Sequence, residues 1–198
     1  SGGVLAAWLS AYAPPGLLCA AYYEDPPLYS SEVAPACGQS IRQSGIGNIF
    51  PIFSTYLGDQ WSVGDWKGMV AFAQSVLPKA ALAMMPFGEE PPQNLKEYDP
   101  EWARAFYTGS GTVGCDHDRM LKNVKVPVLF THHFRMIDEA GVLLGAVSDL
   151  QVARARMLIE GAGQKFVYRS FPQMGHSMHR IDPALYVATL VEWAKPLQ

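Results

Sequence analysis

The sequence has few cysteines and few charged residues, and both shortages exclude classes of protein. Only three of its 198 residues are cysteines (Cys19, Cys37 and Cys115), and none form a Cys-x-x-Cys pair. A disulfide framework is therefore excluded, and a reducing compartment is expected. Charged residues make up 17%, the net charge is −3, and Lys and Arg are scattered. Nucleic acids and anionic membranes are therefore poor partners for this chain.

Long apolar runs are also missing. No stretch reaches the ~18 residues that would suggest a membrane span, and the pattern of a secretory signal peptide is not seen. We therefore expect a soluble, cytoplasmic protein with no membrane partner. The chain has 198 residues, of which 49% are hydrophobic. This is enough for one domain with a substantial core, which would bury roughly 70% of the unfolded surface.

The start of the chain predicts a helix followed by a strand. Ser1-Gly2-Gly3 leads into residues 4–12, which are apolar on almost every side and therefore predict a buried helix. Pro14-Pro15-Gly16 ends that helix, and residues 17–23 form the continuous apolar run of a strand covered on both faces. Because chains rarely begin with a buried helix, we expect the N-terminal strands of the sheet to be missing from this chain.

The last third repeats this alternation of strands and helices. Residues 126–131 predict a second buried strand, and residues 166–171 predict a third strand. Between them, Ser148 is a suitable N-cap for a helix over residues 149–159, and Asp182-Pro183 begins a final helix. The alternation predicts an α/β fold with a mostly parallel sheet.

Residues 31–120 predict a helical cap inserted between core segments 1–30 and 121–198. Residues 62–65 resemble a capping box before a helical stripe, and Asp99-Pro100 begins another helix. Each large apolar side chain here is, taken singly, more typical of helix packing. As a group they predict an apolar substrate pocket, for which we select Trp61, Trp66, Met84, Met85, Phe87, Trp102 and Phe106.

Two motifs resemble the α/β-hydrolase family. Ser1-Gly2-Gly3 before an Ala-rich helix resembles the downstream half of the nucleophile elbow, Gly-x-nucleophile-x-Gly. Its glycines permit a tight strand-to-helix turn, and the helix N-terminus stabilises developing negative charge. Residues 175–179, followed by a capped helix, are similar to the family's catalytic-histidine loop. The resemblance covers the chain loosely, is specific only at these ends, and implies an α/β-hydrolase fold.

The resemblance places the nucleophile in one of two registers. Either Ser1 is the nucleophile, or the nucleophile is the residue just before it and Ser1 offers its backbone N–H to the oxyanion. The second register keeps both glycines in the family's commonest places. In both registers His176 is the general base, because an imidazole can take and return a proton near neutral pH.

The remaining histidines are expected to have other roles. His179 is expected to be structural or to line the pocket, and His132-His133 to support a buried strand end. Asp116-His117-Asp118 lacks a second ligand group at metal spacing and is more typical of a solvated loop. We therefore expect neither a metal nor a cofactor.

The catalytic acid departs from the family's common pattern. Met136 stands where the family usually places an Asp after the strand at residues 126–131. The family also uses the end of the preceding strand, where Glu24 and Asp25 lie, and zearalenone-type lactonases have a Glu there. We therefore predict Glu24 as the acid against His176 Nδ1, with its neighbour Asp25 facing away because strand side chains alternate. The alternatives are Asp25, Asp138 and Asp149.

Together these motifs predict a serine hydrolase with Ser1, Glu24 and His176 as its catalytic residues. The expected substrate is a small hydrophobic or aromatic carboxylic ester or lactone, cleaved through an acyl-enzyme. An Asp before Ser1 would instead imply an epoxide hydrolase or haloalkane dehalogenase. A ligand-binding homologue without turnover is the non-enzymatic alternative. The residues leave open whether the chain forms a homodimer.

Overall fold

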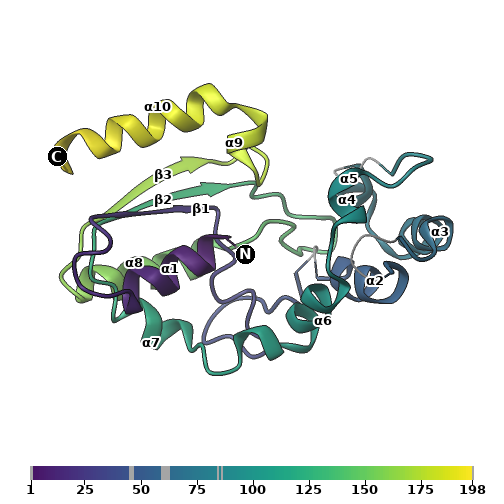
Figure 1. The fold of residues 1–198 in the computed structure, drawn as a ribbon, viewed down its shortest axis with the longest axis horizontal. Helices are drawn as coiled ribbons and strands as arrows, with labels where there is room; N and C mark the ends of the chain where they lie inside the picture. The colour runs from purple at the N-terminus through teal and green to yellow at the C-terminus, as the bar shows by residue number, and fades with distance from the viewer. Residues whose placement is uncertain (1, 45–46, 59–62, 84, 86, 198) are drawn as a thin grey trace.

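The computed structural model describes residues 2–44, 47–58, 63–83, 85 and 87–197 (Figure 1). Within them, a parallel sheet is built from β1 (Ala21–Glu24), β2 (Val128–His133) and β3 (Phe166–Phe171), in the order β1-β2-β3. Helices cover both faces of this sheet (Figure 1). The protein is therefore a mixed α/β structure, as the alternating pattern predicts.

The central strand pairs with both of its neighbours in parallel. Tyr23 is opposite Phe130, and Phe130 is opposite Tyr168. The predicted pairing of residues 126–131 with one of the other strands is thus confirmed on both sides. In the described part of the chain β1 and β3 are the sheet edges, so the outer side of β1 is unpaired there.

Helices α1 (Gly2–Tyr12), α7 (His117–Leu121) and α8 (Asp149–Gly161) lie on one face of the sheet, and α10 (Pro183–Ala194) lies on the other (Figure 1). The main core fills the space between the sheet and the first group. It includes the wholly buried Tyr23, Phe130 and Ile159. The predicted N-cap of α8 is confirmed: Ser148 and Gln151 form a reciprocal capping box.

Helix α1 is less buried than its sequence predicts. Only Ala7, Ser10 and Ala11 are buried, whereas Leu5 is 63% and Trp8 46% exposed. The expectation of an all-round buried helix is wrong for the described residues, because only one side of α1 meets the sheet. The apolar side chains on its other side face outwards.

A second group of helices forms its own apolar cluster away from the sheet. It comprises α2 (Ile49–Tyr56), α3 (Trp66–Val76), α4 (Lys79–Ala83) and α5 (Gln93–Lys96), and α6 (Pro100–Thr108) packs on α2 through Phe106 and Phe50. The helices expected at the stripe beginning with Trp66 and from residue 100 are present, and Asp99 is the N-cap of the second as predicted. The first begins at Asp65, whose side chain accepts from Gly68 N–H, and not at a capping box over residues 62–65, of which residue 62 lies outside the described residues. Short helical turns complete the chain: η1 (Ser110–Thr112), α9 (Met178–Ile181) and η2 (Lys195–Leu197).

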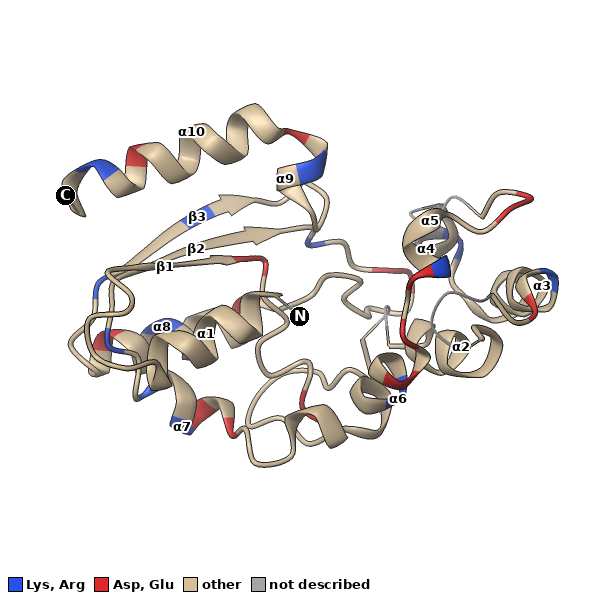
Figure 2. Cartoon of the chain, viewed as in Figure 1, with Lys and Arg blue, Asp and Glu red and all other residues tan. Residues whose placement is uncertain are grey.

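Charged side chains are spread over the helices and loops (Figure 2), and two acidic residues, Glu24 and Asp25, lie together where β1 ends. Among the described helices, none has the length and apolar character needed to cross a membrane.

Candidate functional site

Asp25 immediately follows β1 and turns the chain at the carboxyl edge of the sheet. Its φ of +37° lies in the left-handed region, which Asp tolerates better than most residues. The Asp25 N–H still donates to Thr131 O at 2.9 Å, as a continuing ladder requires. The next ladder bond is different: the N–H of His133 donates to the Asp25 carboxylate (Oδ1, 3.1 Å). The turn thus places a wholly buried carboxylate where a strand carbonyl would otherwise lie.

His176 lies against the other oxygen of this carboxylate. Its Nδ1 is 2.7 Å from Asp25 Oδ2, and its side chain is 49% exposed while that of Asp25 is fully buried. Because a carboxylate only accepts, Nδ1–H is the donor, and the Nε2 atom of the neutral ring carries the lone pair. The arrangement is therefore a buried carboxylate that orients a reachable imidazole base.

The loop that carries His176 is anchored at both ends. The N–H of Phe134, just after β2, donates to Met174 O at 2.8 Å. On the other side of His176, the side chain of Met178 is fully buried. The imidazole is thus exposed on a backbone that is held in place.

The structure contradicts the predicted contact between Glu24 and His176. The Glu24 carboxylate instead accepts from the backbone N–H of His179 (3.0 Å) and contacts its Nδ1 at 2.7 Å. Glu24 points to the α10 face of the sheet, as regular alternation requires, and there it meets α9. Alternation would turn Asp25 away, but its positive φ ends the strand and redirects its side chain. Asp25, named only as an alternative, makes the contact.

The two later acidic alternatives are engaged elsewhere. Asp138 Oδ1 accepts from the N–H groups of Ala140 and Val142 within its own turn. Asp149 Oδ1 is paired with Arg135 Nη1 at 2.6 Å, and its side chain is largely exposed. Neither carboxylate contacts His176, so the carboxylate that does so comes from the sheet edge after β1.

A cavity of about 280 Å³ opens beside the Asp25–His176 pair. The first turn of α1 forms part of its wall, so the positive end of an eleven-residue helix faces this space. Ser1, predicted to act there, lies outside the described residues. The lining residues are Gly2, Gly3, Tyr22, Glu24, Asp25, Pro27, His176, Ser177, His179 and Tyr186.

The predicted pocket side chains do not line this cavity. Trp66 packs on Phe87 with ring centroids 6.0 Å apart, in the apolar cluster that also includes Met85. Trp102 and Phe106 pack on each other, with centroids 4.5 Å apart. These five residues therefore lie away from the cavity beside His176, in contacts among the helices of the second group, where Trp66 is buried and Trp102 is 37% exposed. Trp61 and Met84 lie outside the described residues.

Two tyrosines that the sequence analysis did not select do line the cavity. The rings of Tyr22 and Tyr186 lie 5.3 Å apart, and Tyr22 Oη is 3.1 Å from Thr131 Oγ1. Burial is the main cause that raises the pKa of both phenols. They therefore stay neutral at physiological pH and present apolar rings with hydroxyl groups that can donate hydrogen bonds. The alternation of Tyr22 with buried Tyr23 could have indicated this orientation.

The start of α1 touches the chain just beyond Asp25, and Gly3 permits this approach. A Cβ at Gly3 would lie 2.5 Å from Pro26 Cβ and 2.8 Å from Pro26 Cα, whereas one at Gly2 would meet nothing within 4 Å. We expect Gly3→Ala to lower the free energy of unfolding by about 1–3 kcal/mol, as overpacking does. Gly2→Ala is the matched control. Equal midpoints for the two variants in thermal unfolding would contradict the close approach.

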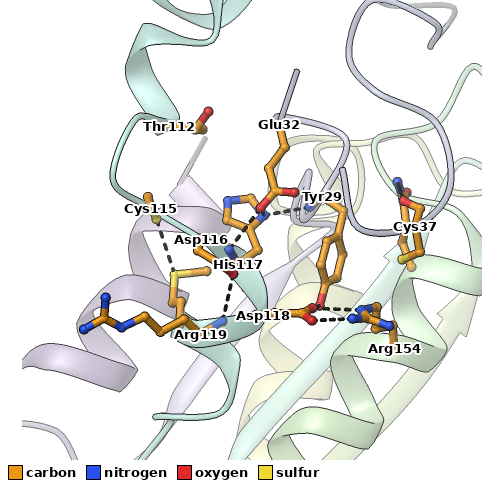
Figure 3. Close-up of polar contacts among 12 residues, drawn as sticks. Tyr29, Glu32, Cys37, Thr112, Cys115, Asp116, His117, Asp118, Arg119 and Arg154 are labelled. Carbon is orange, nitrogen blue, oxygen red and sulfur yellow. Dashed lines mark hydrogen bonds and ion pairs between the residues drawn. The ribbon is translucent and has the colours of Figure 1, made fainter. Parts of the chain in front are cut away.

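A second polar cluster ties the loop after β1 to α7 and α8 (Figure 3). The N–H of Tyr29 donates to His117 Nδ1 (2.7 Å), and its hydroxyl donates to Asp118 Oδ1 (2.8 Å). Arg154 forms a two-pronged ion pair with Asp118. The N–H of His117 donates to Glu32 Oε1 at 3.0 Å. The cluster fixes the path of the segment that follows the Asp25 turn.

The predicted solvated loop at residues 116–118 is wrong. Asp116 is the N-cap of α7, accepting from Arg119 N–H, and His117 is fully buried. Asp118 is held by Arg154, as described above. Across the described ranges, no group of three or more His, Cys, Asp or Glu side chains is arranged to hold a metal ion.

The burial of His117 predicts acid sensitivity of the fold. Desolvation lowers the pKa of His117 from 6.5 to about 4, against the opposing effect of Asp116 and Asp118. As the pH falls from 6.5 towards 4, the unfolded chain takes up a proton that the folded chain does not. His117 should therefore remove up to about 3 kcal/mol from the free energy of unfolding over this window, and nothing above it.

Denaturant titrations at several pH values measure this effect. In His117→Asn the side-chain oxygen can still accept from Tyr29 N–H, but nothing titrates at this position. The variant should lose most of the slope between pH 6.5 and 4, while His179→Ala, a change at a half-exposed histidine, should retain it. An unchanged slope in His117→Asn would contradict the assignment.

Neither a protein-family model nor a curated protein sequence matches this chain. The geometry at the end of β1 is thus the main guide to function.

Proposed function

We propose that this protein is a serine-type hydrolase that cleaves a carboxylic ester or lactone, built on an α/β-hydrolase fold. The observation that carries the proposal is the 2.7 Å contact between His176 Nδ1 and the buried carboxylate of Asp25. It lies beside the first turn of α1, at the carboxyl edge of parallel strands, where α/β sheets gather their sites. The chain order of elbow, acid and histidine is also that of α/β-hydrolases.

In the proposed mechanism, His176 acts as the general base. Its Nε2 takes the proton of a hydroxyl at the start of α1, either that of Ser1 or that of a residue directly before it. The oxygen then attacks the substrate carbonyl carbon. Asp25 keeps the proton on Nδ1 and stabilises the imidazolium that forms.

The remaining steps use the same groups. The carbonyl oxygen becomes an oxyanion near the N-terminus of α1, where backbone N–H groups stabilise it, each such donor being worth ~10²–10³ in rate. The bond to the leaving oxygen breaks as His176 returns its proton to that oxygen. Water, deprotonated by His176, then attacks the acyl-enzyme and releases the carboxylic acid. With a lactone, the alcohol and the acid belong to the same product.

The cavity supports a small, partly apolar substrate. Its volume of about 280 Å³ is just below the range of about 300–1,000 Å³ for small-molecule sites. Tyr22 and Tyr186 offer ring surface, and Glu24 and His179 add polar groups beside them, with the His179 ring 6.0 Å from that of Tyr186. An aryl ester or a lactone with an aromatic ring fits this combination.

Hydrolysis of p-nitrophenyl butyrate by the intact protein tests the proposal. We expect release of p-nitrophenol well above that of the His176→Ala variant, with a burst equal to the enzyme concentration if deacylation limits turnover. An aryl lactone assayed in parallel tests the second substrate class. Equal rates for the wild type and His176→Ala with both substrates would refute the hydrolase assignment.

A further inference from the structure

His133, the last residue of β2, contacts both members of the Asp25–His176 pair. Its backbone N–H donates to Asp25 Oδ1 at 3.1 Å, while Oδ2 of the same carboxylate meets His176. Its imidazole Nδ1 lies 3.2 Å from the carbonyl oxygen of His176. A single residue therefore fixes the carboxylate through its main chain and the histidine loop through its side chain.

The second contact sets the tautomer of His133. Because a carbonyl oxygen only accepts, Nδ1 carries the proton and donates it, and Nε2 carries the lone pair. Nε2 is buried, and no described residue gives it a hydrogen-bond partner. An apolar side chain of similar size would avoid the cost of burying this atom. The imidazole, unlike an apolar side chain, supplies an N–H donor to the carbonyl oxygen of His176.

The packing around His133 makes this contact rigid. The residue is fully buried, and its ring packs edge-on against Phe171 at the end of β3, with centroids 5.9 Å apart. The loop from Phe171 to His176 thus begins and ends on neighbours of this ring. A shift of the His133 ring would move the His176 backbone relative to Asp25, because the Asp25 carboxylate is held by the main chain of His133.

We infer that His133 is a positioning residue that keeps the imidazole of His176 aligned on the Asp25 carboxylate. The inference rests on the proposed function, since it concerns the base of that reaction. His133 does not line the cavity, so its loss should change the alignment of the base and not the binding of the substrate. A misplacement of about 1 Å at such a group can cost about 10²-fold in rate.

Three substitutions isolate the donor. His133→Leu removes it, His133→Asn places an amide N–H near the position of Nδ1, and His133→Gln places it nearer Nε2. All three retain the main-chain bond to Asp25. With p-nitrophenyl butyrate, we expect kcat to fall roughly 10–100-fold in His133→Leu and His133→Gln, with KM within about twofold. His133→Asn should recover most of the lost kcat.

A control and the unfolding midpoints separate positioning from general loosening of the strand. Leu129→Val removes one methylene from a fully buried residue of β2 and should lower the midpoint without lowering kcat. If His133→Leu does not fold, the comparison of Asn with Gln carries the test, because both are polar and differ in where the N–H lies.

The outcomes distinguish this inference from the proposed function. If hydrolysis requires His176 but His133→Leu keeps the wild-type kcat, the positioning role is wrong and the hydrolase proposal stands. If His133→Leu does not fold, His133→Gln takes its place in this comparison. Equal kcat losses in Asn and Gln, or a rise in KM at constant kcat, would also overturn it. If wild type and His176→Ala have equal rates, the proposed function itself fails.

Discussion

Replacing His176 by Ala is expected to lower kcat for ester hydrolysis on the order of 10⁴-fold or more, with the fold intact. The imidazole is half exposed and rests on one buried carboxylate, which keeps its hydrogen bond from His133 N–H when the imidazole is removed. The proposed reaction, however, loses the group to which we assign the transfer of the nucleophile's proton to the leaving oxygen. Steady-state kinetics with p-nitrophenyl butyrate measure the effect.

His179→Ala is the matched control for this prediction. His179 lines the same cavity, is similarly exposed and also rests on a carboxylate, that of Glu24. Loss of His179 should reduce kcat far less, because His179 transfers no proton in the proposed mechanism. Comparable losses in the two variants would indicate that the pocket needs both histidines and that His176 is not a distinct base.

Asp25→Asn is expected to lower kcat by up to ~10⁴-fold, as removal of the orienting carboxylate does in serine proteases. The amide oxygen can still accept from His133 N–H, so the turn should be retained. The amide N–H₂ group, however, faces His176 Nδ1 and favours the tautomer with its proton on Nε2. In that tautomer the ring cannot accept the nucleophile's proton.

Glu24→Gln is the paired measurement, because the two acids are adjacent and both line the cavity. It should cost little in kcat, since Glu24 contacts His179 and not His176. A large loss of kcat in Glu24→Gln and a small loss in Asp25→Asn would support Glu24 as the acid, as the sequence predicted. That result would contradict the role assigned to the Asp25–His176 contact.

The sequence could predict those parts of the fold that depend on local patterns. The bounds of β3 agree with the strand expected at residues 166–171, and the helices at Ser148, Asp99 and Asp182 begin at the caps that their side chains predict. Caps and strand periodicity act over a few neighbouring residues, so one sequence is sufficient to find them.

The choice between two adjacent acids could not be predicted in the same way. Alternation along a strand predicts opposite directions for Glu24 and Asp25, and it fails because the backbone of Asp25 has a positive φ. Nothing in Glu24-Asp25-Pro26-Pro27 reveals that angle, which is set where the chain meets β2 and Gly3. The pocket residues were missed for a similar reason: aromatic spacing does not say whether Trp66 or Trp102 packs on a cap helix or lines a cavity.

Covalent labelling of the intact protein with a fluorophosphonate, followed by peptide mass spectrometry, tests the central claim most directly. An activated hydroxyl displaces fluoride from phosphorus and keeps the phosphonyl group. We predict a single adduct at the start of α1, on Ser1 or the residue directly before it, formed rapidly in the wild type and Glu24→Gln and very slowly in His176→Ala and Asp25→Asn. A wild-type protein that is not labelled, or an adduct elsewhere that forms equally fast in His176→Ala, would contradict the account.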